Sequence, residues 1–196
     1  MPPEGPSGLL HRWAAQWSPC PPIGHELHVI HPDRWVRFHS LPGSKRYAED
    51  DAEYATLLDR HNTVINELFA GEDVYVFTAD WSETDTPNPE GELSRRLSPG
   101  SEPWTTILTA DDPDPEFRVY THLRVRRTPW RIGSLDPLLR SVADYESAGV
   151  IIADTALKQL YHPYDGGADA LLASTTDRDA LRERHRDWLS THPSGL

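Results

Sequence analysis

The chain has almost no cysteine, and it has no long hydrophobic run. Cys20 is the single cysteine among 196 residues, so no disulfide can form within the chain, and a reducing compartment, the cytoplasm, is favoured. No apolar stretch approaches the roughly 18 residues that a membrane-spanning helix needs. The N-terminus also lacks the basic patch and apolar segment of a signal peptide. These absences predict a soluble protein that does not associate with membranes.

Basic residues are scarce as well. The 19 lysines and arginines face 31 aspartates and glutamates, which gives a net charge of 19 − 31 = −12. Residues 49–116 hold 18 acids and three bases, whereas residues 118–140 hold six arginines and one acid. Nonspecific binding to nucleic acid needs a basic surface, so no nucleic-acid partner is predicted. An acidic face would suit a basic protein partner, although ordinary solubility explains the same excess.

Known catalytic motifs are missing. The sequence has no Gly-x-Ser-x-Gly element and no glycine-rich turn between a strand and a helix, so neither that hydrolase motif nor a nucleotide cofactor is indicated. Cys20 stands among prolines, where no helix terminus lowers the pKa of a thiol. The sequence therefore favours a protein that is not an enzyme and that holds no cofactor.

Two clusters have residue types that bind metals, but their patterns do not fit a metal site. His25, His28 and His31 recur at intervals of three, which would make them neighbours on a helix. The segment instead resembles a strand over Leu27–Ile30, where His25 and His28 would point to opposite faces. The acidic turn at 111–116 lacks the glycine and the distant glutamate of a calcium-binding loop. We therefore predict no metal site.

What is present is a mixed pattern of helices and strands. Length and composition favour one globular domain. Hydrophobic spacing predicts helices over Gly8–Trp17, Asp50–Ala70 and Asp136–Ser147, and a final helix capped by Thr176. Besides Leu27–Ile30, strands are expected at Trp35–Phe38, Val74–Ala79, Trp104–Thr109, Phe117–Arg126, Gly149–Ala153, Leu157–His162 and Ala168–Ala173.

These elements predict an α+β fold, in which about four helices pack on a mainly antiparallel sheet. Residues 1–33 form an N-terminal helix and a proline-rich lead-in, and residues 34–196 form the α+β domain, with both parts in one globular unit. A long polar loop is expected at 82–103, because this stretch shows neither helical nor strand periodicity.

The most distinctive segment is Tyr161-His162-Pro163-Tyr164-Asp165-Gly166-Gly167-Ala168-Asp169. Asp165 and Asp169 could serve as a base or a ligand, with His162 as a proton shuttle. A structural role is favoured: Asp165 would bind backbone amides of the turn, the glycines would form it, and the aromatic rings would be buried. Arg37, in a basic cluster upstream, could clamp a carboxylate or pair with an acid of the chain itself.

These residues also carry a resemblance. The pattern Tyr161-His162-x-Tyr164-Asp165-x-Gly167-x-Asp169, followed by Trp188-Leu189, resembles a bacterial family catalogued as domain of unknown function 3885. Arg37-Phe38 with Leu41, the helix with Arg60 and Leu68-Phe69, and the strand Asp73-Val74-Tyr75 extend the similarity to about Trp35–Leu189. Family members often have an acid where this chain has His39. In the turn they tend to have Asp-Asp-Arg-Gly, whereas this chain has Asp165-Gly166-Gly167, so no role of the family's arginine carries over. The resemblance implies a shared fold and no particular activity.

Three alternatives remain open, and the plainest is a structural domain whose distinctive residues only hold the fold together. Another is a non-catalytic binding or immunity-type protein that engages a basic protein, and a link to toxin–immunity loci rests on analogy alone. Its candidate binding residues are Arg37, Tyr161, His162, Tyr164, Asp165, Gly167 and Asp169. The third is a hydrolase-type enzyme with a pocket at the Tyr161–Asp169 turn, which requires these side chains to converge in a cleft.

Overall fold

The computed structural model describes residues 6–87 and 92–190. Its centre is a seven-stranded sheet in the order β1-β7-β6-β5-β2-β4-β3, in which every neighbouring pair is antiparallel. The strands are β1 (Trp35–His39), β2 (Asp73–Ser82), β3 (Glu102–Ala110), β4 (Val119–Pro129), β5 (Ile151–Asp154), β6 (Leu160–Tyr164) and β7 (Gly167–Leu171). The predicted α+β class with an antiparallel sheet is confirmed.

Among the described residues, six α-helices are present rather than about four. They are α1 (Pro6–Trp17), α2 (Gly24–Ile30), α3 (Asp51–Phe69), α4 (Glu92–Leu97), α5 (Asp136–Ala143) and α6 (Thr175–Arg184). Short 3-10 turns occur at η1 (Pro42–Ser44), η2 (Pro115–Phe117) and η3 (Arg186–Trp188). None of the described helices is both long and apolar enough to cross a membrane.

Two helices were not anticipated. The stretch expected as a strand at Leu27–Ile30 is α2, because Leu27 is fully buried against the sheet while Val29 and Ile30 stay exposed. Helix α4 falls inside the predicted loop 82–103, of which residues 88–91 lie outside the described part. The cap of α6 is also corrected: the side chain of Ser174, and not Thr176, accepts the backbone N–H of Asp177.

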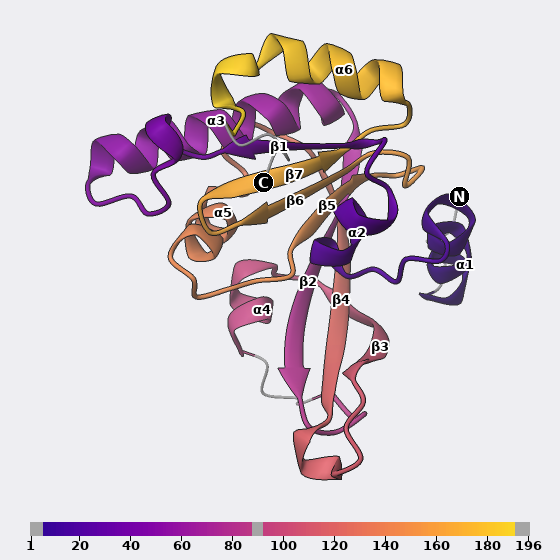
Figure 1. Ribbon diagram of the computed structural model, residues 1–196. Coiled ribbons are helices and arrows are strands. Elements are labelled where there is room, and N and C mark those ends of the chain that lie inside the picture. Colours follow the sequence, from indigo (N-terminus) through magenta and orange to yellow (C-terminus); the bar gives the residue numbers. More distant parts are fainter. Residues whose placement is uncertain (1–5, 88–91, 191–196) are drawn as a thin grey trace.

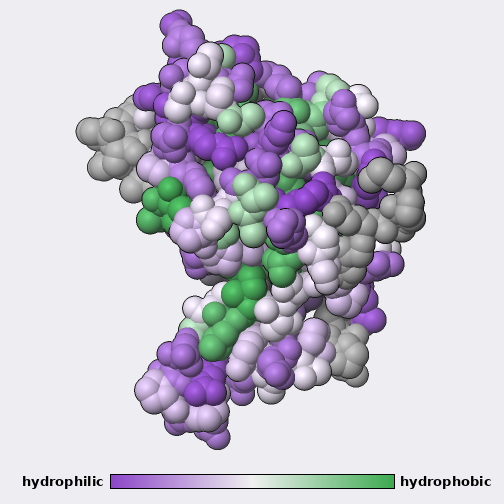
Figure 2. Space-filling view, turned by 90° about the vertical axis from the view of Figure 1, so that its right-hand side faces the viewer, coloured by the Kyte–Doolittle hydropathy of each residue, from purple (hydrophilic) through white to green (hydrophobic). Residues whose placement is uncertain are grey.

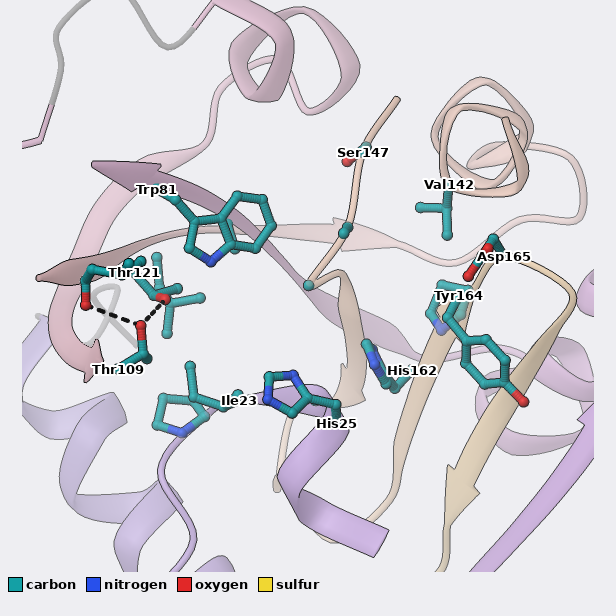
Figure 3. A pocket seen from close by; sticks show the side chains of 18 of the residues that line it. Ile23, His25, Trp81, Thr109, Thr121, Val142, Ser147, His162, Tyr164 and Asp165 are labelled. Carbon is teal, nitrogen blue, oxygen red and sulfur yellow. Dashed lines mark hydrogen bonds between the residues drawn. The ribbon is translucent and has the colours of Figure 1, made fainter. Parts of the chain in front are cut away.

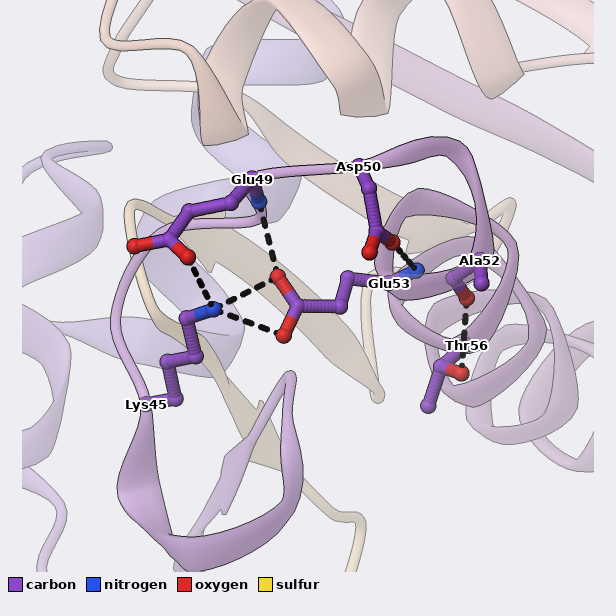
Figure 4. A network of polar contacts seen from close by, with 6 residues as sticks. All are labelled: Lys45, Glu49, Asp50, Ala52, Glu53 and Thr56. Atoms are coloured by element: carbon purple, nitrogen blue, oxygen red, sulfur yellow. Dashed lines mark hydrogen bonds and ion pairs between the residues drawn. The ribbon is translucent and has the colours of Figure 1, made fainter.

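The acidic residues that predicted the start of helix α3 bind its free backbone amides in the structure. The carboxylate of Asp50 accepts the backbone N–H of Glu53, and Glu53 in turn accepts the backbone N–H of Glu49 (Figure 4). Lys45 donates to both oxygens of Glu53 at 2.6 and 2.7 Å. Free amides at a helix start favour such acidic partners. The predicted range 50–70 therefore agrees with the observed helix to within one residue at each end.

The sheet separates two hydrophobic cores. Helices α3, α5 and α6 cover one face, where Ile65, Leu139 and Leu181 pack against strand residues such as Val76 and Ile152. Helices α1 and α2 cover the other face (Figure 1), where their apolar side chains meet neighbouring strand positions; the set includes Trp13, Trp17, Leu27, Phe77, Ile151 and Ala153. Alternate residues of β5 therefore point into different cores, as the pleat of a strand requires.

A three-stranded arm projects from this body (Figure 1). Strand β5 pairs with β2 only over Val74–Phe77, whereas β2 pairs with β4 as far as Ser82. Beyond Phe77 the sheet therefore consists of β2, β4 and β3 alone. We define the arm as residues 78–87 and 105–124, which include the loop between β3 and β4.

Candidate functional site

Register places three of the predicted site residues in one row across the sheet. Arg37 of β1 lies opposite Asp169 of β7, and Asp169 lies opposite His162 of β6. Directly opposite residues of antiparallel strands share a face. The row faces α2, because Leu160 and Leu171, two positions away from His162 and Asp169, belong to the core beneath α1 and α2.

Arg37 and Asp169 form a buried, bidentate ion pair. The guanidinium donates from Nε to Oδ1 at 2.7 Å and from a terminal nitrogen to Oδ2 at 2.9 Å, and Asp169 is only 1% exposed. The guanidinium also lies 5.2 Å from the ring centre of Trp35 and 5.0 Å from that of Tyr164. Of the alternatives for Arg37, pairing with an acid of the chain itself is the one observed.

His162 is held in a single tautomer. Its Nδ1 lies 2.7 Å from the backbone oxygen of Val150, and a carbonyl oxygen can only accept, so Nδ1 carries the hydrogen. Burial lowers the pKa of His162, which favours the neutral ring. The remaining nitrogen, Nε2, is then an acceptor. Gly24 packs so close to the ring that a Cβ there would lie 2.4 Å from it, so the N-terminus of α2 covers His162 tightly.

Tyr161 points to the opposite face and takes part in a different cluster. Its hydroxyl lies 2.7 Å from Nδ1 of His61 in α3, and Nε2 of His61 lies 3.1 Å from Oγ of Ser40. Burial lowers the pKa of His61 to about 4 and raises that of Tyr161. In the sequence His61 is indistinguishable from the apolar stripe of its helix, so this partnership was not predicted.

The His61 cluster leads to a prediction about acid stability. The folded-state pKa of His61 lies below the ordinary value of 6.5, so the unfolded chain takes up a proton first as the pH falls. The contribution of neutral His61 to the free energy of unfolding is fully present above pH 6.5. It declines by on the order of 3 kcal/mol as the pH falls to about 4. We expect H61Q to lose less stability than the wild type over that window in urea unfolding. Parallel losses in both proteins would contradict this expectation.

The hydrogen-bond partners of Asp165 differ from those predicted for its structural role. It does not bind turn amides; its Oδ2 accepts from Nε of Arg46 at 2.9 Å and from the hydroxyl of Tyr47 at 3.0 Å. Gly166 adopts the positive φ (93°) that this turn requires. Gly167 is enclosed, because a Cβ there would lie 2.6 Å from both the backbone oxygen of Phe38 and the hydroxyl of Tyr164. Asp165 and Asp169 are thus bound by different arginines.

The Tyr161–Asp169 turn borders a pocket with a volume of about 420 Å³. It lies between the body and the arm, and its walls come from the start of α2, from β2, from both strands of the β3–β4 hairpin, from the loop at 145–149 and from β6. His162 and His25 lie side by side at its edge, while the hydroxyl of Tyr164 points away from it (Figure 3). The wall residues Trp81, Tyr145 and Gly149 carry no periodicity that could have identified them in the sequence.

The three clustered histidines separate even though they lie on and beside a helix. His25 borders the pocket, the ring of His28 lies 5.3 Å from that of Trp35, and Nε2 of His31 lies 3.1 Å from the backbone oxygen of Trp17. In the described part of the chain, no group of three His, Cys, Asp or Glu residues lies close enough to hold a metal ion.

Comparison with known proteins gives one match. No curated protein and no solved structure matches the chain. The family model "Domain of unknown function (DUF3885)" matches residues 23–193, which is longer than the predicted span of about 35–189 and includes α2. Because the model covers most of the sequence, including the Tyr161–Asp169 turn and the Arg37 strand, the chain belongs to the DUF3885 family.

Proposed function

We propose that this protein is a non-catalytic binding protein of the immunity type, which engages a basic protein partner in the cytoplasm through its arm. The observation that carries the proposal is the charge of the arm. Residues 78–87 and 105–124 hold seven acids and two bases. A surface with this excess attracts a basic partner over long range and speeds its encounter.

The shape of the arm supports the same function. The arm projects beyond the body, so a partner can approach it from several sides (Figure 1). Hydrophobic surface separates its hydrophilic end from the body in the space-filling view (Figure 2). Phe117 is exposed and stands directly after the acidic loop. An exposed aromatic residue among charges is the type of side chain that anchors protein interfaces.

The contacts made by residues of the Tyr161–Asp169 turn give less support to a hydrolase-type function. Asp169 would have to break a buried ion pair before it could act as a base, and Asp165 would have to leave Arg46 and Tyr47. His162 uses Nδ1 to hold a backbone carbonyl. Catalytic bases are placed within reach of a substrate proton, whereas these groups are placed to hold strands and loops together.

Neutralising the acidic loop tests the proposal. The tip variant carries D111N, D112N, D114N and E116Q. Asparagine keeps an oxygen that can accept the turn amides which Asp112 and Asp114 now accept, so the loop should remain folded. We expect the wild type to retain a basic protein from a lysate at about 0.05 M salt and to release it at about 0.5 M. The tip variant should retain at least about tenfold less of the same protein, since each lost pair across an interface weakens binding.

The matched control removes the same number of charges from the body. It carries D59N, E146Q, E183Q and D187N, all at exposed positions outside the arm. The control should retain the partner as the wild type does. If both variants retain equally less of the partner, only net charge matters. If both retain it as the wild type does, the acidic loop of the arm is not part of the interface. The immunity role further requires that co-expression of the chain protects cells from the retained protein when that protein is toxic.

A further inference from the structure

The pocket between the body and the arm is a preformed cavity that the proposed function does not use. Its volume of about 420 Å³ falls within the range of about 300–1,000 Å³ that is usual for small-molecule sites. It is lined mostly by apolar atoms from segments that are far apart in the sequence. Such a cavity removes water from most of the surface of a small ligand.

His162 lines this cavity and has one ring nitrogen for which no protein partner is found among the described residues. His162 is 5% exposed, and its Nδ1 is committed to the carbonyl of Val150, so its Nε2 is left as an acceptor. Figure 3 shows the ring edge of His162 directed toward the pocket, beside His25. A ligand that places an N–H or O–H group against Nε2 would satisfy it. The ligand's donor would take the place of water at Nε2, in a setting where apolar walls strengthen the hydrogen bond.

The opposite wall is aromatic and is held in place by the backbone. The indole of Trp81 borders the cavity and is 50% exposed. Gly149 lines the same cavity and packs closely against this wall, because a Cβ at this position would lie 2.8 Å from Cβ of Ala79 and 3.3 Å from the indole. Gly149 also has a positive φ of 68°, and Tyr145 at the other end of the same loop has a φ of 59°. A flat ring could stack on this wall.

The walls offer little to a charged ligand. The carboxylate of Asp165 is already bound by Arg46 and Tyr47, and burial lowers the pKa of His162, which favours its neutral ring. An ion that leaves water for an apolar cavity without a counter-charge pays a large desolvation cost. The ligand class is therefore a neutral one.

We propose that this pocket binds a small, uncharged aromatic compound through stacking on Trp81 and a hydrogen bond from the compound to Nε2 of His162. The test uses two probes of nearly equal size, 2-naphthol and 2-methoxynaphthalene, in isothermal titration calorimetry at neutral pH. Only 2-naphthol carries the O–H donor. We expect 2-naphthol to bind with a Kd below about 1 mM and at least about tenfold more tightly than its methyl ether.

Three variants keep the result tied to this pocket. A148W, at an exposed position of the wall, should fill the cavity and abolish binding of both probes. A156W, at an exposed position outside the cavity, should bind both as the wild type does. H162F keeps a ring but removes the acceptor, so the two probes should bind with similar affinity; if H162F does not fold, the A148W and A156W pair still decides the location.

The proposal is overturned if the wild type binds neither probe below about 1 mM, or if it binds both equally. It is also overturned if A148W binds 2-naphthol as tightly as A156W does. None of these results bears on the acidic loop of the arm, whose variant should leave probe binding unchanged. Failure of the pocket and failure of the partner interaction are therefore distinguishable.

Discussion

D169A is expected to lower the free energy of unfolding by about 3–5 kcal/mol. The substitution leaves the guanidinium of Arg37 without its bidentate partner between β1 and β7, where the Arg37 side chain is 17% exposed. Breaking a buried ion pair costs far more than the pair contributes, because the remaining charge has lost both water and counter-charge. Urea unfolding monitored by circular dichroism measures the effect.

Two controls separate burial from charge. D165A removes a carboxylate of the same turn, but its partner Arg46 is 62% exposed, so water can solvate the freed charge. We expect D165A to cost about 1 kcal/mol or less. The double variant R37M/D169L removes both buried charges and should be more stable than D169A alone. A loss for D169A no larger than that for D165A would show that the Arg37–Asp169 pair does not hold β1 to the sheet.

The sequence predicted the sheet well because its strands carry local signals. Glycine at the Asp165–Gly166 turn and alternation along the strands indicate antiparallel hairpins. Each of these signals can be recognised within a short segment of the sequence. Helix α3 was predicted for the same reason, since its cap and its apolar stripe are local. Helix α2 was not, because it is only seven residues long, has no side-chain cap and buries just Gly24 and Leu27, so its local signals are weak.

Most of the residues singled out in the sequence lie near one another, whereas Tyr161 contacts His61 on the other face, and the pairings among them were not predicted. Arg37 and Asp169 were both singled out, yet they are 132 positions apart, and only the register of β1 with β7 brings them together. Asp165 was expected to bind amides nearby, but its partners come from the segment after β1. Pairings of this kind depend on tertiary structure, which no spacing within one segment encodes.

Trp17 provides the sharpest test of how residues 1–33 relate to the rest of the chain. Trp17 is fully buried, and its indole N–H donates to the backbone oxygen of Leu157 at 2.7 Å. The guanidinium of Arg34 lies 3.9 Å from its ring centre. These contacts join α1 to the β5–β6 connection and to the start of β1. We therefore propose that residues 1–33 and 34–196 unfold together as one globular unit.

We expect W17A to lower the free energy of unfolding by about 3–5 kcal/mol, because it opens a large cavity and leaves the Leu157 carbonyl without its donor. The measurement is again urea unfolding by circular dichroism, which does not depend on the lost indole. L10A, at a residue of the same helix that is 39% exposed, should cost less than about 1 kcal/mol. A single transition shifted to lower urea supports the joint unit. Two separate transitions, or a loss as small as that of L10A, would instead mean that α1 is a detachable lead-in, and that the core beneath it is stabilised by the sheet and α2 alone.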